Sequence, residues 1–329
     1  MITEILPGFY QVKLPFPSNP LRDCNVYIVK GGDKSLMVDT GIDFPESRGE
    51  LLDGIKKLGV DLKRTEFFLT HMHVDHTGNI VVLADDNSTV YFSRPDADIL
   101  DYNSPENRVG RAELSIQNGF PPGDMTAGGP LERRSHPMRD FAEKRGYRFN
   151  YVADGQVIRV GDFAFTCIMT PGHTKGHVCL YEPDKKVFLS GDHILQDISP
   201  NISTWRPDEN PLADYLSSLN KVYNLEVKLV LPGHRRIFPD LKARIDELKH
   251  HHEWRANEAL SILSGNGRQT GYQVASHMTW DVSQKTWEEI PVWQRMFATG
   301  EAIAHLRYLV VEDKVRQYSD DSRILFSIK

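Results

Sequence analysis

Three histidines and an aspartate stand within six positions, at His71, His73, Asp75 and His76. They follow the apolar run "FFLT", which is typical of a buried strand. Imidazole and carboxylate groups are poor core material, so packing does not account for them. Because residues two apart in an extended segment point the same way, His71 and His73 can bind one ion. Asp75 and His76 lie where the chain turns toward a helix and can face a neighbouring point.

The same order of features recurs in three later segments. Each is an apolar strand followed by a glycine-containing turn with a histidine or an aspartate: "FTCIMTPGHTKGH" with His173, "KVFLSGDH" with Asp192 and "VKLVLPGH" with His234. Sheet proteins place ligand sites at strand ends. The seven side chains offer nitrogen and oxygen donors only. They are too many for one tetrahedral ion but suit two divalent ions with open positions, with zinc, iron or manganese all compatible.

The elements that must position these side chains are short strands and helices in alternation over residues 1–240. Residues 103–150 are rich in Gly, Pro and Arg, which predicts a helical or irregular insertion, either a lid or a passive surface loop. Residues 241–329 read as helices followed by two short strands around an Asp-Asp-Ser turn. The sequence therefore predicts a catalytic domain at 1–240 and a helical, winged-helix-like module at 241–329.

Composition excludes several classes of function. The net charge of −6 gives no general attraction for nucleic acid or an anionic membrane, and residues 241–329 carry 12 basic and 12 acidic side chains. No stretch approaches the roughly 18 apolar residues of a membrane span, and no export signal is recognisable. The three cysteines, Cys24, Cys167 and Cys179, form no CxxC pair. We therefore expect a cytoplasmic protein with neither a disulfide framework nor a thiolate metal site.

The motifs THMHVDHTG, PGHTKGH, SGDH and LPGH resemble those of the metallo-β-lactamase superfamily, hydrolases with an αββα sandwich. The resemblance covers about residues 8–240 and implies an α+β fold of that kind. Within the superfamily, "GDHILQDISPN", "PLADYLSSL" and a helical C-terminal module resemble the glyoxalase-II-like and lactamase-like-protein groups.

Carried over by motif, the resemblance implies a role for each candidate ligand. A first metal ion would be held by His71, His73 and His173. A second would be held by Asp75, His76 and His234. Asp192 would bridge the two ions, and Asp39 in "VDTG" would support the site from behind the ligands.

Departures from the motifs narrow the choice within the superfamily. Secreted antibiotic-degrading β-lactamases carry an export signal and lack an aspartate at the Asp192 position. Flavodiiron oxygen reductases have glutamate in place of His73 and carry a flavin domain. The C-terminal region does not resemble the glutathione-binding helices of glyoxalase II, which argues against glutathione thioesters.

The expected function is therefore a binuclear metallohydrolase. A hydroxide bridging the two ions would attack the carbonyl of a small-molecule thioester, ester or lactone. Asp75 could also accept the proton of the attacking water. Two alternatives remain open: a metal-dependent endoribonuclease or phosphodiesterase, disfavoured by the balanced charge of residues 241–329, and a sulfur dioxygenase with one iron at the same histidines.

Several neighbouring residues have secondary expectations. His177 is expected to position its turn or donate a hydrogen bond to the site, and His193 to contact substrate. Arg133 and Arg134 form either a solvated face or a contact to an anionic substrate such as a coenzyme A phosphate. The consecutive histidines 250–252 are expected to be solvated surface. The C-terminal module would cover the active-site mouth, shape the substrate pocket or contact a second copy in a homodimer.

Overall fold

The fold is described from a computed structural model of the chain. It describes residues 1–17, 19–102, 108–126, 141, 148–204, 206, 208–284, 286–319 and 322–329. Arg133, Arg134 and much of the expected 103–150 insertion lie outside these residues. The chain divides into two compact units. Unit 1 comprises Met1–Tyr102, Ser135–Pro200 and Ser218–Ile245, and unit 2 comprises Asn103–Arg134, Asn201–Ser217 and Asp246–Lys329.

Unit 1 contains two β-sheets. The first has seven strands in the order β1 (Ile2–Leu6), β2 (Phe9–Pro15), β3 (Asp23–Lys30), β4 (Ser35–Val38), β5 (Thr65–Phe68), β6 (Val90–Phe92) and β7 (Asn150–Tyr151). Strands β1 to β4 pair antiparallel, and β4 to β7 pair parallel. The parallel pairing brings the C-terminal ends of β4 and β5 to the same edge.

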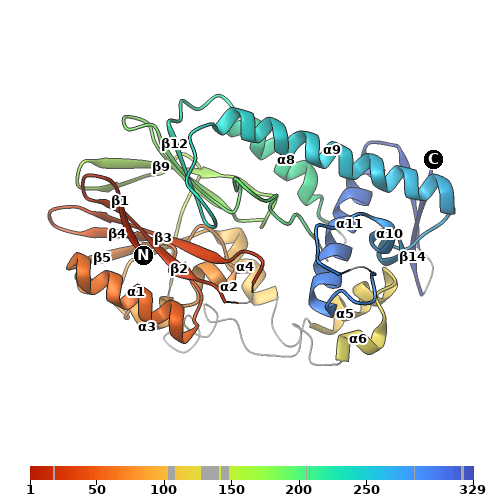
Figure 1. Cartoon of the computed structure of the whole chain (residues 1–329), viewed down its shortest axis with the longest axis horizontal. Helices are drawn as coiled ribbons and strands as arrows, with labels where there is room; N and C mark the ends of the chain where they lie inside the picture. Colours follow the sequence, from red (N-terminus) through yellow and green to blue (C-terminus); the bar gives the residue numbers. More distant parts are fainter. Residues whose placement is uncertain are drawn as a thin grey trace. The chain divides into compact units, whose positions relative to one another are not determined.

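The second sheet has five strands in the order β12 (Leu229–Pro232), β11 (Val187–Gly191), β10 (Val178–Glu182), β9 (Phe163–Met169) and β8 (Val157–Val160). Only β11 and β12 pair parallel within this sheet. The two sheets face each other across one apolar layer, to which Phe9 and Phe68 contribute from the first sheet and Phe165 and Leu189 from the second. Figure 1 shows this pair of sheets.

Helices cover the outer faces of both sheets. Helix α1 (Pro45–Leu58) begins with a proline and ends at Gly59, whose φ of 61° suits a left-handed helix end. Its buried Leu51 and Ile55 pack against the first sheet. On the second sheet, the end of α8 (Pro211–Val222) is tied to the end of β9, because Lys221 Nζ donates to Met169 O at 2.9 Å. These layers make the αββα sandwich expected from the motifs.

Short helices connect the strands of unit 1 and carry several residues of interest. They are the 3₁₀ helix η1 (Leu62–Arg64), α2 (Val74–Thr77), α3 (Ile80–Leu83) and α4 (Arg94–Tyr102). Strand β3 is buried on both faces, because α1 lies on one side and the second sheet on the other. Its nearly continuous apolar sequence reflects that double burial.

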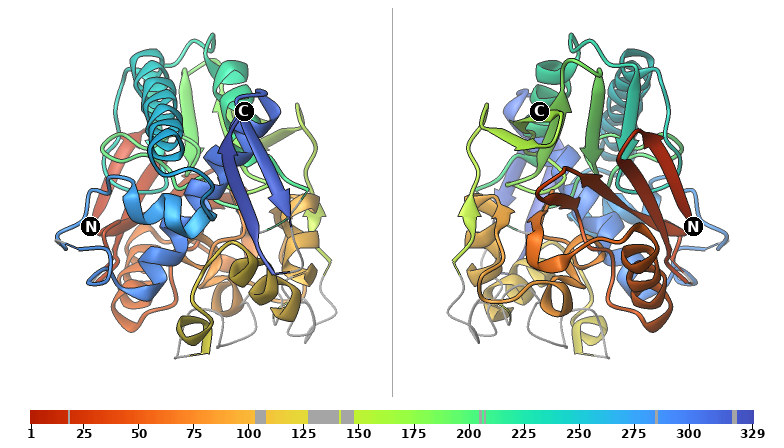
Figure 2. Two further views of the ribbon diagram at one scale, coloured as in Figure 1. Left: turned by 90° about the vertical axis from the view of Figure 1, so that its right-hand side faces the viewer. Right: turned by 90° about the vertical axis from the view of Figure 1, so that its left-hand side faces the viewer.

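Unit 2 is mostly helical. Its described elements include α5 (Arg108–Gln117), α6 (Pro122–Thr126), most of α9 (Leu241–Asn266), α10 (Gly271–His277), α11 (Val292–Val311) and a hairpin of β13 (Val315–Ser319) and β14 (Ile324–Ile328). The hairpin is clear in Figure 2. Helix α10 begins with a capping box between Thr270 and Gln273. A core around Leu263, Val274 and Phe326 joins the helices to the hairpin. A helical C-terminal domain is present as the sequence predicts, but unit 2 also includes segments that precede residue 241.

The expectation that histidines 250–252 are all solvated is wrong for His252. Its side chain is buried, with Nδ1 3.2 Å from His305 Nε2 and its ring against that of Tyr215. Helix α9 turns this position toward α11, whereas His250 is exposed. Within the described residues, no helix combines the length and the apolar character that a membrane crossing requires.

Candidate metal centre

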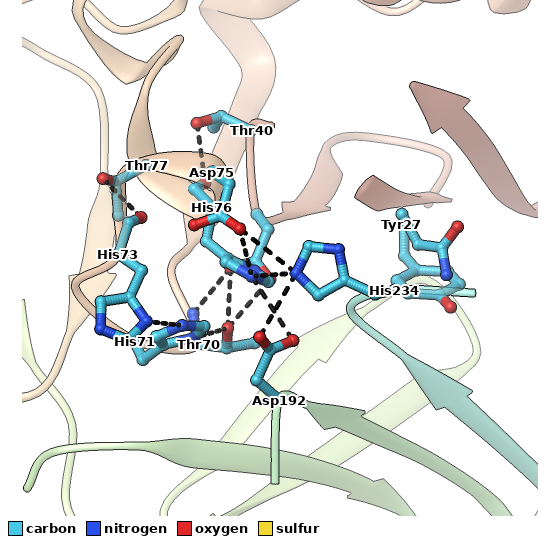
Figure 3. Close-up of polar contacts among 12 residues, drawn as sticks. Tyr27, Thr40, Thr70, His71, His73, Asp75, His76, Thr77, Asp192 and His234 are labelled. Atoms are coloured by element: carbon cyan, nitrogen blue, oxygen red, sulfur yellow. Dashed lines mark hydrogen bonds and ion pairs between the residues drawn. The ribbon is translucent and has the colours of Figure 1, made fainter. Parts of the chain in front are cut away.

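The turn that carries the first four candidate ligands follows β5 directly. Thr77 Oγ1 donates to His73 O at 3.0 Å, and Thr40 donates to His76 O through its backbone N at 2.6 Å and its hydroxyl at 2.9 Å. These bonds fix the backbone on both sides of Asp75. The turn therefore presents its side chains toward the ends of β11 and β12, as Figure 3 shows.

Three imidazoles form the first group of candidate ligands. His73 Nδ1 lies 3.1 Å from His71 Nε2 and 3.0 Å from His173 Nε2. Thr70 Oγ1 lies 3.0 Å from the other ring nitrogen of His71, which leaves Nε2 facing the group. Burial, followed by the neighbouring imidazoles, lowers the pKa of His71 well below its usual value and that of His73 to about 3. The rings of His71 and His73 are therefore neutral, which is the form that binds a metal ion.

The second group joins the HxHxDH turn to the end of β12. His76 Nε2 and His234 Nε2 lie 3.2 Å apart, and His234 Nε2 lies 3.3 Å from Asp75 Oδ2. Burial opposes charge on all three groups. Asp192 nevertheless raises the pKa of His76 and of His234 well above the usual value, while the hydrogen bond and charge of His234 lower the pKa of Asp75.

Asp192 lies between the two groups. Its Oδ2 is 3.3 Å from His234 Nε2 and 3.7 Å from His173 Nε2, and its Oδ1 is 3.5 Å from His76 Nε2. Burial would raise the pKa of this carboxyl, but the charges of His234 and His76 hold it well below its usual value. One ionised carboxylate thus faces both sets of ring nitrogens.

The candidate ligand atoms lie close enough together to bind metal ions. Three combinations have ligand atoms within 4.8 Å of one another: His71 with His73 and His173, His71 with His76 and Asp192, and Cys24 with Asp75 and His234. The neutral rings of His71 and His73 have nitrogens 3.1 Å apart, which direct lone pairs at one another unless a proton or a cation lies between them. Nitrogen and carboxylate donors at this spacing could hold divalent ions.

Asp39 supports the second group from the end of β4. His76 Nδ1 donates to Asp39 Oδ2 at 2.8 Å, and the backbone N of Thr70 donates to Asp39 Oδ1 at 2.8 Å. Asp39 is buried, and its φ of 60° is a conformation that non-glycine residues rarely adopt. Its carboxylate fixes the ring so that His76 Nε2 faces His234 and Asp192.

His177 holds the backbone of Asp192. Its Nδ1 lies 2.9 Å from Thr170 Oγ1, and its Nε2 accepts a hydrogen bond from the backbone N of Asp192 at 3.1 Å. Both ring nitrogens of His177 therefore have hydrogen-bonding partners outside the group formed by His71, His73 and His173. His193, expected as a substrate contact, is fully buried, with its ring centre 6.1 Å from that of His177.

Glycine is required where the turns pass closest to the ligands. A Cβ at Gly233 would lie 2.4 Å from Asp192 Oδ1 and 2.6 Å from His76 Cε1. A Cβ at Gly176 would lie 2.5 Å from the backbone N of Asp96. The glycines of the PGH and KGH turns thus allow the close approach of the backbone to the site.

Sequence reasoning missed Asp96, which ties two ligand-bearing turns together. This buried residue of α4 accepts hydrogen bonds from Met72 N at 2.9 Å, Thr174 Oγ1 at 2.8 Å and Gly176 N at 2.6 Å. Burial outweighs these donors and raises the pKa of its carboxyl to about 6. One sequence feature could have identified Asp96: like the candidate ligands, it follows a strand, which here is β6.

Sequence reasoning also missed Cys24. The cysteine pattern predicts no thiolate metal site, yet Cys24 belongs to the third combination of converging donors, with Asp75 and His234. Burial raises the pKa of its thiol, and a hydrogen bond with His234 opposes that shift. Nothing in the short stretch around Cys24 could reveal this, because its partners come from distant parts of the chain.

Comparison with known families identifies the class of the fold and the site. Residues 19–234 match the family described as the metallo-beta-lactamase superfamily, and residues 279–327 match the metallo-beta-lactamase-like C-terminal domain. Because the first match covers more than half of the chain, this protein belongs to the metallo-β-lactamase superfamily.

Curated relatives are similar at low identity. The Bacillus subtilis protein named probable metallo-hydrolase YqjP is 24% identical over 331 residues, which cover 96% of each chain. The human protein named acyl-coenzyme A thioesterase MBLAC2 is 26% identical over 65% of this chain and 74% of its own length. The Emericella nidulans lactamase-like protein aptB is 24% identical over 76% of this chain, and the match spans 65% of that relative.

Solved structures share the fold over nearly the whole chain. A metallo-beta-lactamase family protein from Thermus thermophilus has a TM-score of 0.81 and 26% identity, covering 99% of this chain and 100% of its own. A beta-lactamase domain protein from Burkholderia ambifaria has a TM-score of 0.75 and 21% identity, covering 100% and 95%. Both comparisons include the C-terminal helices as well as the sandwich.

Proposed function

We propose that this protein is a binuclear metal-dependent hydrolase that cleaves a small-molecule thioester or ester, including a lactone. The observation that carries the proposal is the position of Asp192, whose carboxylate faces His173 on one side and His76 and His234 on the other. The names of two relatives, a probable metallo-hydrolase and an acyl-coenzyme A thioesterase, support a hydrolase acting on such bonds.

The proposed ligand sets follow the two groups. The first ion would be held by His71, His73 and His173. The second would be held by Asp75, His76 and His234, with Asp192 shared. Zinc binds nitrogen and carboxylate donors and can keep a coordination position open for water or substrate. Iron or manganese could also occupy the two sites. When bound, two such ions would polarise the substrate carbonyl and lower the pKa of a water molecule.

The chain's own residues would prepare the reaction around the ions. Asp39 holds His76 in one orientation, and His177 holds the backbone of Asp192. Asp75 stays ionised because His234 and His76 lower the pKa of its carboxyl despite burial. An ionised carboxylate beside the reacting water can accept its proton, which is the role we assign to Asp75 in addition to ligation.

A substrate panel tests this proposal. Purified protein, stripped with a chelator and reloaded with zinc, is assayed with acyl-coenzyme A thioesters, lactones, bis-p-nitrophenyl phosphate and single-stranded RNA. We expect thioester or lactone cleavage that disappears on chelation and returns with zinc. A His250→Ala variant, altered at an exposed residue of α9, serves as the control.

The same panel decides between the proposal and its alternatives. Phosphodiester or RNA cleavage without thioester or lactone cleavage would overturn the proposal in favour of a nuclease. Oxygen consumption with a persulfide by iron-loaded protein, without hydrolysis of any ester, would overturn it in favour of a sulfur dioxygenase. The balanced charge of residues 241–329, with 12 basic and 12 acidic side chains, disfavours a nucleic-acid partner.

A further inference from the structure

Cys24 lies against the second group of candidate ligands. Its side chain is buried, and its Sγ, a carboxylate oxygen of Asp75 and a ring nitrogen of His234 all lie within 4.8 Å of one another. The cysteine comes from β3, the aspartate from the HxHxDH turn and the histidine from the end of β12. A sulfur donor therefore adjoins two of the proposed ligands.

Hydrogen bonds on both sides of Cys24 fix its place beside His234. Residue 23 precedes it, and His234 Nδ1 donates to the backbone O of Asp23 at 2.6 Å. Residue 25 follows it, and the backbone N of Asn25 donates to Gly233 O at 2.8 Å. The start of β3 and the turn carrying His234 thus form one bonded unit, so Cys24 cannot move away without breaking it.

The simpler interpretation is that Cys24 is only a core residue. It does pack in the apolar cluster of Val12, Leu14 and Val26. Packing explains its burial, but it does not explain why the thiol meets a carboxylate and an imidazole at the end of that cluster. A buried carboxylate or imidazole requires a charged or hydrogen-bonding partner, and a neutral thiol is a weak partner for both groups.

We propose that Cys24 supplies a thiolate ligand to the ion held by Asp75, His76 and His234. This inference rests on the proposed function, because it requires that the site binds metal ions. On binding, the thiol proton leaves to solvent and a sulfur–metal bond forms. Neighbouring donors of a bound zinc ion lie about 3.5 Å apart. The three donor atoms of Cys24, Asp75 and His234 lie within 4.8 Å of one another, so they would approach each other by at most about 1.3 Å.

A thiolate at this position makes the two halves of the centre chemically different. The first half offers imidazole nitrogens and the shared carboxylate. The second half adds sulfur, which selects zinc over manganese or magnesium. The expected consequence is that one of two bound ions is zinc-selective and the other accepts several metals.

Zinc X-ray absorption and cobalt absorption spectra test the proposal on the intact chain. Because the spectrum averages over the two zinc ions, we expect about half a sulfur per zinc ion, at a distance of about 2.3 Å, in the wild-type protein. Cobalt-loaded protein should show a sulfur-to-cobalt charge-transfer band in the near ultraviolet. Both signals should vanish in Cys24→Ala, and zinc affinity at one of the two equivalents should fall at least tenfold while manganese affinity changes less.

Matched variants separate ligation from packing. Val26→Ala removes a packed side chain two residues along the same strand and should keep both signals. The chain has three cysteines, so the double variant Cys167→Ala/Cys179→Ala leaves Cys24 alone. We expect that double variant to keep the sulfur signal, which decides the matter even where Cys24→Ala does not fold.

Two results would count against the account in different ways. Two bound zinc ions with nitrogen and oxygen neighbours only, or a sulfur signal that survives in Cys24→Ala, would overturn the role of Cys24 and leave the hydrolase proposal standing. A protein that binds no divalent ion at all would overturn the proposed function itself.

Discussion

Asp39 Oδ2 lies 2.8 Å from His76 Nδ1, although the two residues are 37 positions apart in the chain. Parallel pairing of β4 and β5 makes this contact, because it places the ends of both strands side by side. The backbone of Asp39 adopts the left-handed conformation there, with φ at 60°. Local strain of this kind persists only where the surrounding structure fixes it, and here the carboxylate is held by Thr70 and His76.

The contact predicts that Asp39→Asn weakens metal binding without unfolding the sandwich. An amide cannot accept from both Thr70 and His76 with the same strength as a carboxylate, so the His76 ring loses its fixed orientation. We expect a loss of about 10–100-fold in affinity for the second ion, the usual effect of losing such a supporting residue. Competition with a chromophoric chelator measures it.

Asp43→Asn is the control for that variant, because Asp43 pairs with Arg48 at the surface and touches no candidate ligand. Unchanged affinity for both ions in Asp39→Asn would contradict the role of the Asp39–His76 contact.

Removing a proposed ligand should remove metal and turnover together. His73→Ala takes away the nitrogen that lies 3.0–3.1 Å from two other rings. Asp192→Ala takes away the carboxylate between the groups. For each variant we expect the loss of one or both ions and of nearly all activity, measured by metal analysis and by the substrate panel. Wild-type metal content and wild-type rate in either variant would show that the ligand assignment is wrong.

Asp96 is expected to contribute to both the free energy of unfolding and the turnover number, because it is buried and accepts hydrogen bonds from two ligand-bearing turns. In Asp96→Ala, Met72 N, Thr174 Oγ1 and Gly176 N lose their acceptor in a buried place, at a cost of about 1–3 kcal/mol for each donor left unpaired. Both ligand-bearing turns then loosen, so the turnover number should fall as well. Urea unfolding and steady-state kinetics measure the two effects.

Asp98→Ala provides the comparison on the same helix. Asp98 is exposed and pairs with Arg94, a surface ion pair worth less than about 1 kcal/mol. Equal losses of stability and rate in the two variants would argue against a positioning role for Asp96.

Stability at acid pH should depend on the buried pair His252 and His305 of unit 2. His305 Nδ1 donates to Glu301 O at 2.9 Å, and its Nε2 faces His252. Burial lowers the pKa of His305 to about 4, and burial and His305 lower the pKa of His252. Both rings are therefore neutral in the folded chain. The stability they contribute is complete above the unfolded pKa of about 6.5 and is lost as the pH falls toward 4.

For His305 alone this lost stability amounts to about 3 kcal/mol between those pH values. His305→Asn keeps a donor for Glu301 but removes the titration, so its free energy of unfolding should fall less between pH 7 and pH 4.5 than that of the wild type. Tryptophan fluorescence follows unit 2, which contains Trp254, Trp280, Trp287 and Trp293. His250→Asn is the exposed control, and identical pH dependence in His305→Asn and wild type would contradict the prediction.

Local sequence patterns indicated that the seven side chains follow strand ends, and the resemblance to a known family supplied the sandwich and the division of these side chains into two groups. Parallel pairing brings the ends of strands together at one edge of the sheet. His71 and His73 were expected in an extended segment, whereas the structure places them in the turn after β5, where they still face one another. The positions of Asp96 and Cys24 at the site were not predicted, because their partners are distant in the sequence. Asp96 accepts a hydrogen bond from Gly176, 80 residues away. Strand β3 is hydrogen-bonded to the turn carrying His234 across more than 200 residues. Sequence periodicity carries no information about such pairings.

The extent of unit 2 also could not be predicted from local sequence patterns. Residues 103–134 and 201–217 group with the helices beyond residue 246, whereas the sequence suggested one division near residue 240. The burial of His252 depends on α11, since His305 of that helix lies against it. Three identical residues in a row give no signal for which one faces inward, because that depends on which side of α9 the partner helix covers.

Diffraction at the zinc absorption edge from zinc-loaded protein tests the central claim most directly. The account predicts two anomalous peaks, one among His71, His73 and His173 and the other among Asp75, His76 and His234, with Asp192 in contact with both. Zinc bound elsewhere in the chain, with these side chains away from any ion, would contradict it.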